Sequence, residues 1–283
     1  MTDWRYKQNR DGGWAYNQGC SWTEPTAFVL LAQIATKIDR PSFEAGMKFL
    51  RSTQRSDGGW SPHPEVTEST WVTALAALMP EEAIGADRVK QALEWLEGQT
   101  GRESTWSFEF QQWIHGIREK NPEGWPWFPN TAAWVIPTSL GILAFERGLT
   151  HGENRSLRGR VNQARQFLFA RMCADGGWNH GANRALGRDG DSYPETTGIA
   201  LLALHGASRA PMNINDAAAI ERAKQAARRH LAVCKTAEGT AWLRMGLAAH
   251  GEVSPLQFPP VSRTTVDAAL TAISSGFCNP LLS

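Results

Sequence analysis

A short turn built from two glycines and a tryptophan recurs along this chain and limits what it can fold into. It occurs as Gln-Asn-Arg-Asp-Gly-Gly-Trp at 8–14, Gln-Arg-Ser-Asp-Gly-Gly-Trp at 54–60 and Cys-Ala-Asp-Gly-Gly-Trp at 173–178. A looser form, Glu-Gly-Trp-Pro-Trp, stands at 123–127. After each turn an acidic or threonine-rich start leads into an apolar run, near Glu24, Glu68, Pro137 and Glu195, and another such start at Arg263 lacks a clean turn. Self-similarity of this kind predicts a repeat architecture.

The apolar residues between the turns predict helices in pairs. The first helix of each pair is apolar on most of its surface, at about 24–37, 66–78, 132–148 and 194–206. The second is apolar on one face, at about 41–53, 87–99, 158–174 and 216–234. Further helical segments are expected at about 105–118, 240–249 and 262–275. No segment shows the alternation of a strand, so the expected fold is all-α with roughly eleven or twelve helices.

Stacked helix pairs form either an open solenoid or a closed ring with an inner and an outer layer. The chain begins almost inside its first repeat, so either the final helix closes against this end or the natural product starts earlier. A length of 283 residues suits one repeat-built domain over 1–283.

The Gly-Gly-Trp turn has a structural explanation. Aspartate and glycine supply the backbone angles that stop a helix sharply, since glycine tolerates positive φ. The indole can then lie over the ends of helices, and the glutamine ahead of the turn can bond to exposed helix-end groups. We therefore expect the turns to join one helical pair to the next rather than to carry chemistry.

Composition excludes several classes of protein. Lysine and arginine total 29 against 28 aspartates and glutamates, so no overall field favours nucleic acid. The start shows no charged-then-apolar signal segment, and no apolar run approaches the roughly 18 residues of a membrane span. A cytoplasmic location without a cofactor is the resulting expectation. Thirteen tryptophans exceed what the turns alone require.

Cysteine and histidine spacing argues against a metal site. The four cysteines are far apart and form no CxxC pair, which favours reduced, mostly buried thiols over a disulfide framework; they are Cys20, Cys173, Cys234 and Cys278. The seven histidines are scattered, with none paired at i, i+4. We expect no bound metal.

The repeated turns, together with the threonine-rich helix starts after them, resemble the QW repeat of the prenyltransferase and squalene oxidase superfamily. That superfamily includes squalene-hopene and oxidosqualene cyclases and the β subunits of protein prenyltransferases. The resemblance rests on 8–14, 54–60 and 175–178 and extends over nearly the whole chain at repeat spacing. It implies an α/α toroid of about six inner and six outer helices, with an apolar cavity where the inner helices begin and an isoprenoid or other hydrophobic substrate.

Several chemical motifs of the superfamily are incomplete here. Cyclases that protonate a double bond carry Asp-x-Asp-Asp at an inner-helix start, whereas 189–192 is Asp-Gly-Asp-Ser. Those cyclases also use two barrels, and this length allows one. The Asp-x-Cys zinc motif of protein prenyltransferases is absent. Gly19-Cys20 resembles the start of complement-type thioester motifs, but Thr23 stands where the required glutamine would be.

Carboxylates at the inner-helix starts are the first catalytic candidates. Glu24 follows Ser21, and Glu195 follows Ser192, at the spacing of a capping box. Glu68 has no serine or threonine three residues earlier, which favours a pocket role. If the inner helices are parallel, all three carboxylates lie at one rim as an acid or cation site. A capping role is the alternative for Glu24 and Glu195.

Asp189 and Asp191 form a second acidic candidate. Proton-initiated cyclisation needs a carboxylic acid kept protonated by an apolar or like-charged environment, and two neighbouring aspartates could provide one. A solvated loop is the alternative, because arginines and glycines flank the pair. If the protein is an enzyme of this kind, Asp191→Asn or Glu68→Gln should abolish turnover with unchanged melting.

Tryptophans near inner-helix starts are the candidates for lining a substrate cavity, where aromatic faces hold a travelling positive charge. They are Trp22, Trp71, Trp113, Trp127 and Trp134. Core packing is the alternative role for the same side chains.

Two functions are consistent with these patterns. One is a terpene cyclase-like or prenyl-transferring enzyme acting on an isoprenoid inside the barrel. The other is a non-catalytic barrel that binds a lipid, a peptide or a partner protein at its rim, or contacts a membrane peripherally. The excess of tryptophan favours the first, and the missing catalytic motifs favour the second.

Overall fold

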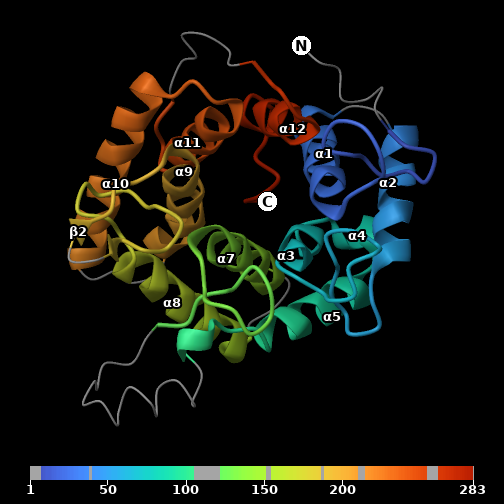
Figure 1. Cartoon of the computed structure of the whole chain (residues 1–283), viewed down its shortest axis with the longest axis horizontal. Helices are drawn as coiled ribbons and strands as arrows, with labels where there is room; N and C mark the ends of the chain where they lie inside the picture. The colour runs from blue at the N-terminus through green and yellow to red at the C-terminus, as the bar shows by residue number, and fades with distance from the viewer. Residues whose placement is uncertain are drawn as a thin grey trace.

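The helices form two concentric layers around a central axis. The computed structural model describes residues 8–37, 40–104, 122–150, 154–185, 188–209, 214–253 and 261–282. The inner layer consists of α1 (Thr23–Thr36), α3 (Val72–Ala77), α7 (Val135–Leu149), α9 (Pro194–Ala203), α11 (Ala237–Ala249) and α12 (Thr265–Ser274) (Figure 1). The outer layer consists of α2 (Arg40–Thr53), α5 (Ala86–Glu97), α8 (Arg155–Ala170) and α10 (Ile214–Val233). The predicted α/α toroid is confirmed.

The pattern of burial explains the two layers. In α1, residues 27–32 are all buried, so this helix has protein on every side. In α5 the buried residues are Val89, Ala92, Leu93 and Leu96, which lie on one stripe. A helix of the first kind can only be an inner one, while a helix of the second kind covers it from outside. No helix in the described ranges is long and apolar enough to cross a membrane.

Short elements differ from the sequence-based prediction. The helix predicted from about Val66 begins only at Val72. The residues before it are held by the preceding turn, since the Ser69 hydroxyl donates to Asp57 at 2.7 Å and the Thr70 N–H donates to the Trp60 carbonyl at 2.8 Å. Three short helices were not predicted: α4 (Glu81–Ile84) and the 3-10 helices η2 (Arg102–Ser104) and η3 (Leu204–Arg209). Two strands, β1 (Arg184–Ala185) and β2 (Arg188–Asp189), pair antiparallel and are too short to show alternation. The helix predicted at 105–118 lies outside the described residues.

Each Gly-Gly-Trp turn is closed by its aspartate. In the second repeat Asp57 Oδ1 accepts a bond from the Gly59 N–H at 3.0 Å and one from the Ser69 hydroxyl at 2.7 Å. Gly58 has φ +90°, and a Cβ there would lie 2.7 Å from the carbonyl oxygen of Gln91 on α5. Glycine is therefore required both by backbone angle and by the close approach of an outer helix.

The tryptophan of the turn joins an inner helix to an outer one. The Trp60 N–H donates to Thr73 Oγ1 on α3 at 2.9 Å, and the Trp60 indole N–H donates to the Leu50 carbonyl on α2 at 2.8 Å. The Gln54 amide donates to the Gly58 and Arg88 carbonyls at 2.9 and 3.1 Å. The expected structural role of the turn is confirmed by these bonds.

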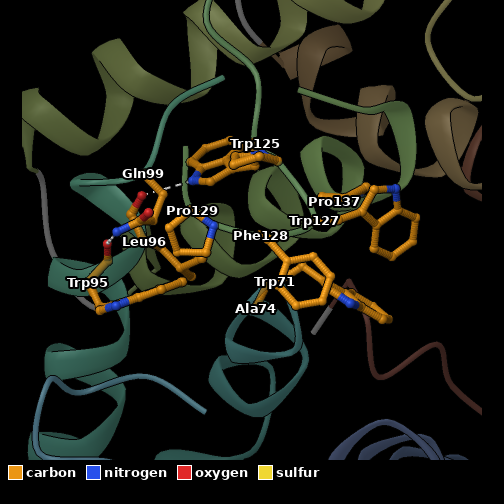
Figure 2. A pocket seen from close by; sticks show the side chains of 11 residues that line it. Trp71, Ala74, Trp95, Leu96, Gln99, Trp125, Trp127, Phe128, Pro129 and Pro137 are labelled. Atoms are coloured by element: carbon orange, nitrogen blue, oxygen red, sulfur yellow. Dashed lines mark hydrogen bonds between the residues drawn. The ribbon is translucent and has the colours of Figure 1, made fainter. Parts of the chain in front are cut away.

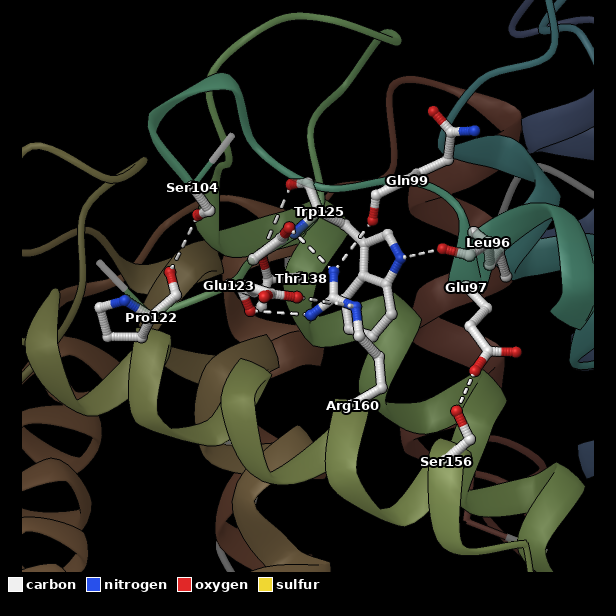
Figure 3. Close-up of polar contacts among 11 residues, drawn as sticks. Leu96, Glu97, Gln99, Ser104, Pro122, Glu123, Trp125, Thr138, Ser156 and Arg160 are labelled. Carbon is white, nitrogen blue, oxygen red and sulfur yellow. Dashed lines mark hydrogen bonds and ion pairs between the residues drawn. The ribbon is translucent and has the colours of Figure 1, made fainter. Parts of the chain in front are cut away.

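The looser turn at Trp125 lacks the aspartate, and an arginine holds it instead (Figure 3). Arg160 of α8 is buried, with its guanidinium 3.7 Å from the centre of a Trp125 ring. It donates to the carbonyls of Glu123, Gln99 and Gly124 at 2.9 to 3.0 Å. Burial lowers the pKa of Arg160 to about 10, against the opposing charge of Glu123, so the guanidinium stays charged at neutral pH.

Backbone bonds between successive repeats close the ring. The start of each of four inner helices donates an N–H to the residue two places after a turn tryptophan of another repeat. The pairs are Thr23 to Pro62, Trp71 to Trp127, Val135 to His180, and Thr265 to Tyr16. The last bond, at 2.7 Å, joins α12 to the first turn, and α12 packs beside α1. The final helix thus closes against the first repeat.

The end of the chain crosses the ring where the inner helices finish. The Phe277 N–H donates to the Ala35 carbonyl near the end of α1 at 3.0 Å. Arg147, near the end of α7, donates to the Pro280 carbonyl at 3.1 Å, and Leu281 is buried. Figure 1 shows this segment at the centre of the ring. It covers the end opposite the inner-helix starts.

We expect Gly12→Ala to lower the free energy of unfolding by about 1–3 kcal/mol more than Gly19→Ala does. Both residues have positive φ, +91° and +101°. A Cβ on Gly12 would lie 2.3 Å from the Ala45 carbonyl oxygen of α2, whereas a Cβ on Gly19 would meet nothing within 4 Å. Urea unfolding of both variants measures the difference. Equal losses would mean that the approach of α2 to the turn carries no cost of its own.

Candidate functional site

The mouth of the toroid is the end where the inner helices begin. Its residues are the N-caps of those helices: Trp22, Trp71, Trp134, Tyr193, Thr236 and Thr264. The backbone bonds between repeats fix these positions relative to one another. Aromatic N-caps cannot bond the helix N–H groups with their side chains, so their rings are left to form a surface.

Aromatic rings at the mouth contact one another across repeats. Trp22 lies 4.7 Å from the ring of His63, and Trp71 lies edge-on to Trp127 at 4.7 Å. Trp134 is 37% exposed and lies 6.3 Å from His180. Four of the predicted lining tryptophans therefore occur at the mouth or beside it. The fifth, Trp113, lies outside the described residues.

A small aromatic pocket opens beside Trp71. It has a volume of about 10 Å³, and Trp71, Trp95, Trp125, Trp127 and Phe128 are among its lining residues (Figure 2). Ligand pockets for drug-sized molecules usually measure about 300–1,000 Å³. This pocket has room for about one water molecule, so it is too small to hold part of an isoprenoid chain.

Four carboxylates from four inner helices gather on one side of the mouth. They are Glu24 of α1, Glu195 of α9, Glu238 of α11 and Asp267 of α12, each in the first turn of its helix. Glu238 is exposed at the mouth, and the protein around it removes only part of its hydration. This loss, followed by the charges of Glu195, Glu24 and Asp267, raises the pKa of Glu238 to about 7. A bond from the Trp242 side chain opposes the rise.

Glu24 is paired with a tyrosine from the first turn. The Tyr16 hydroxyl donates to Glu24 Oε2. Burial raises the pKa of Glu24, and the bond from Tyr16 lowers it. Burial, followed by the charge of Glu24, raises the pKa of Tyr16 above its usual range. Glu24, in the first turn of α1, thus binds the Tyr16 side chain at the mouth and does not cap its own helix.

The predicted capping boxes at Glu24 and Glu195 are wrong. Neither Trp22 nor Tyr193, the actual N-caps, makes a side-chain cap bond. Ser21 instead donates to Asp11 of the preceding turn at 2.7 Å. Ser192 donates to Asp175 at 2.7 Å and lies 2.6 Å from His230 Nε2. The turn aspartates take the serine hydroxyls that a capping box would need.

The other predicted acids lie away from this cluster. Asp189 lies in β2, which Figure 1 shows near α10 at the outside of the ring. Asp191 and Glu68 are exposed in loops ahead of α9 and α3. None of the three is among the charges that raise the pKa of Glu238. The structure brings Glu24 and Glu195 together and leaves Glu68, Asp189 and Asp191 outside the cluster.

Sequence reasoning missed three members of the site. Glu238 was missed because the helix around 240–249 begins at Ala237, capped by Thr236. Asp267 forms a capping box with Thr264. The spacing Thr-x-x-Asp in the sequence could have predicted this pair. Tyr16 stands two residues after Trp14. In the other repeats this position is occupied by Pro62, Trp127 and His180, which accept the backbone bonds between repeats.

The cysteines are free thiols but not mostly buried. Only Cys173 is buried, while Cys20 and Cys278 are exposed and Cys234 is intermediate. The expectation of buried thiols fails because Cys20 and Cys278 lie in surface loops. Within the described ranges, no three His, Cys, Asp or Glu side chains come together as metal ligands.

Comparison with known proteins gives similarity to terpene cyclases. No protein-family model matches the sequence. The chain is 27% identical over 204 residues to drimenyl diphosphate synthase of Streptantibioticus cattleyicolor. The matched region covers 70% of this chain and 34% of that protein. It therefore spans about a third of the length of this curated relative.

Solved structures share the fold. The type II terpene cyclase MstE from Scytonema is 16% identical, with 95% of this chain and 73% of that chain covered at a TM-score of 0.57. A variant of MstE was solved with its substrate, geranylgeranyl dihydroxybenzoate. A family 8 glycosyl hydrolase, an endoglucanase from Klebsiella pneumoniae, is 15% identical with 97% and 98% covered at a TM-score of 0.60. The toroid alone thus does not decide the chemistry. Together with the sequence match, it shows that the chain resembles terpene cyclases in sequence and in fold.

Proposed function

We propose that the chain, as a single barrel over 1–283, holds an isoprenoid across its mouth and starts a cyclisation by proton transfer from Glu238. The observation that carries this proposal is the gathering of four first-turn carboxylates at the mouth, Glu24, Glu195, Glu238 and Asp267. The pKa of Glu238, raised there to about 7, is consistent with a carboxyl group that is partly protonated at neutral pH. A general acid works best when its pKa lies near the operating pH. Partial loss of hydration, followed by the like charges of Glu195 and Glu24, supplies the environment that keeps this carboxyl group protonated.

The proposed cyclisation needs no co-reactant besides the isoprenoid substrate. The Glu238 carboxyl gives its proton to one carbon of a double bond, and a tertiary carbocation forms at the other carbon. Further double bonds of the same chain attack the cation in turn and close rings. Loss of a proton from the last cation to a basic group ends the reaction, so the product is an isomer of the substrate. The rings of Trp22 and Trp134 offer π faces to the positive charge on its way.

The relatives support the substrate class. One relative is a synthase of drimenyl diphosphate, and the MstE variant was solved with geranylgeranyl dihydroxybenzoate as its substrate. Both compounds are isoprenoids. The chain spans about a third of the length of the first of these proteins.

The test is incubation of the purified protein with geranylgeranyl diphosphate, farnesyl diphosphate and squalene, followed by mass spectrometry of organic extracts. We expect a product isomeric with one substrate. Its rate of formation should be highest below pH 7 and fall as the pH rises through about 7, because the acid loses its proton there. A rate that instead rises through this range would rule out Glu238 as the acid.

A non-catalytic barrel is the second candidate. The observation that favours it is the position of Asp189 and Asp191, the nearest match to the cyclase acid motif, on an exposed edge of the ring. In that case an isoprenoid or other lipid would bind at the mouth and be extracted unchanged after incubation.

A further inference from the structure

An exposed cysteine lies against a histidine at the mouth of the toroid. Cys20 stands in the loop ahead of α1, and His63 follows the second Gly-Gly-Trp turn. The Cys20 sulfur lies 3.1 Å from His63 Nε2, although the two residues are 43 positions apart in sequence. The pair therefore forms only when the first two repeats are stacked, and it takes no part in the proposed cyclisation.

The histidine ring is held in one orientation. Its centre lies 4.7 Å from that of the Trp22 ring, and His63 Nδ1 accepts the Glu65 N–H at 3.2 Å. Because Nδ1 is an acceptor, the neutral ring carries its proton on Nε2 and donates it to the Cys20 sulfur. A nucleophile within hydrogen-bond reach of a histidine that a third group orients is the arrangement found at activated side chains.

This hydrogen bond favours the reactive form of the thiol. A thiolate accepts an N–H bond more strongly than a thiol does, so the bond from His63 stabilises the ionised sulfur. The thiolate, and not the thiol, attacks other sulfur atoms. The Glu65 carboxylate lies 3.9 Å from His63 Nδ1 but is 91% exposed, so solvent screens its charge from the sulfur. Cys20 itself is exposed, and a small reagent can reach it.

We propose that Cys20, held by His63, is a modification site at which a low-molecular-weight disulfide forms a mixed disulfide with the protein. Solvent takes the thiol proton, the Cys20 thiolate attacks one sulfur of the reagent, and the S–S bond of the reagent breaks. The other half of the reagent leaves as a thiolate and takes a proton from solvent. A free thiol reverses the step by the same exchange. The attached group stands beside Trp22 and narrows the mouth on the side of α1, because His63 contacts both side chains.

The test is incubation of the whole protein with oxidised glutathione at neutral pH, followed by peptide mass spectrometry of samples taken over time. Cys278 is exposed as well and serves as the internal control. It follows Phe277, whose N–H binds the Ala35 carbonyl at the opposite end of α1. We expect Cys20 to be modified about tenfold faster than Cys278. Cys173 is buried and reports unfolding, so the two rates are compared while it stays unmodified.

Two variants assign the effect to the pair. His63→Phe keeps a ring beside Trp22 and removes Nε2, so the ratio of the Cys20 rate to the Cys278 rate should fall to about one. Cys20→Ser should lose the fast modification, and dithiothreitol should restore the unmodified mass of the wild-type protein. Equal rates at the two cysteines in the wild type, a ratio that persists in His63→Phe, or an adduct that survives the reductant would each overturn the proposal.

Discussion

Glu238→Gln is expected to lower the turnover of an isoprenoid substrate by roughly a hundredfold to ten-thousandfold while leaving the fold intact. The amide keeps the size of the side chain and cannot supply a proton. Initial rates of product formation in wild type and variant, measured at pH 6, give the effect. A second expected result is that the residual rate no longer falls as the pH rises through about 7.

The same substitution should change how stability depends on pH. The pKa of Glu238 in the folded state, about 7, lies above its ordinary value of 4.5. Between these values the native protein keeps a proton that the unfolded chain releases, so wild-type stability falls as the pH rises through this window. Glu238→Gln removes this contribution. We expect the variant to melt at the same or a higher temperature than wild type at pH 8, which shows that lost turnover is not lost folding.

Asp191→Asn is the matched control for the position of the acid. Asp191 is exposed and stands in the nearest match to the cyclase motif. Because it lies outside the acid cluster, its substitution should leave turnover unchanged. Loss of turnover in Asp191→Asn with retention in Glu238→Gln would return the acid role to the Asp-Gly-Asp-Ser segment.

Much of the fold could be predicted because its determinants are local. The turn residues Asp57, Gly58 and Trp60 are adjacent in sequence and fix both the end of one helix and the place of the next. The difference between helices buried all round and on one face also appears directly in the apolar pattern. Arg160 could not be predicted in the same way. Its three carbonyl partners belong to a segment 36 to 61 residues away.

The site could be predicted only in outline. Parallel inner helices place their first turns at one end, which brought Glu24 and Glu195 to the mouth as expected. The pKa of Glu238 is raised by loss of hydration and then by charges from three other helices. No local pattern indicates which first-turn acids face one another. The capping boxes predicted from the Ser-x-x-Glu spacing are wrong for the same reason: Ser21 bonds to Asp11 in the preceding turn.

Arg160→Met is expected to lower the free energy of unfolding by about 3–5 kcal/mol. Methionine keeps part of the apolar stem that packs on Trp125 but removes the donors to the Glu123, Gln99 and Gly124 carbonyls. Buried acceptors that lose their partner pay the cost of lost hydration, and the turn has no aspartate to replace the lost bonds. Because these bonds hold the Trp125 turn, the loss also removes a support of the inner-helix start at Trp134, whose N–H donates to the Trp125 carbonyl.

Two further variants separate this role from a general effect of charge. Arg158 lies on the same helix and is exposed, so Arg158→Met should change stability by less than about 0.5 kcal/mol. Arg160→Lys keeps the charge but cannot reproduce the planar fork, and its loss should fall between the other two. Guanidinium chloride unfolding of all three variants measures these differences. If Arg160→Lys is as stable as wild type, charge alone holds the turn; if Arg160→Met matches Arg158→Met, the carbonyl bonds add nothing to stability, and the turn is held by Trp125 alone.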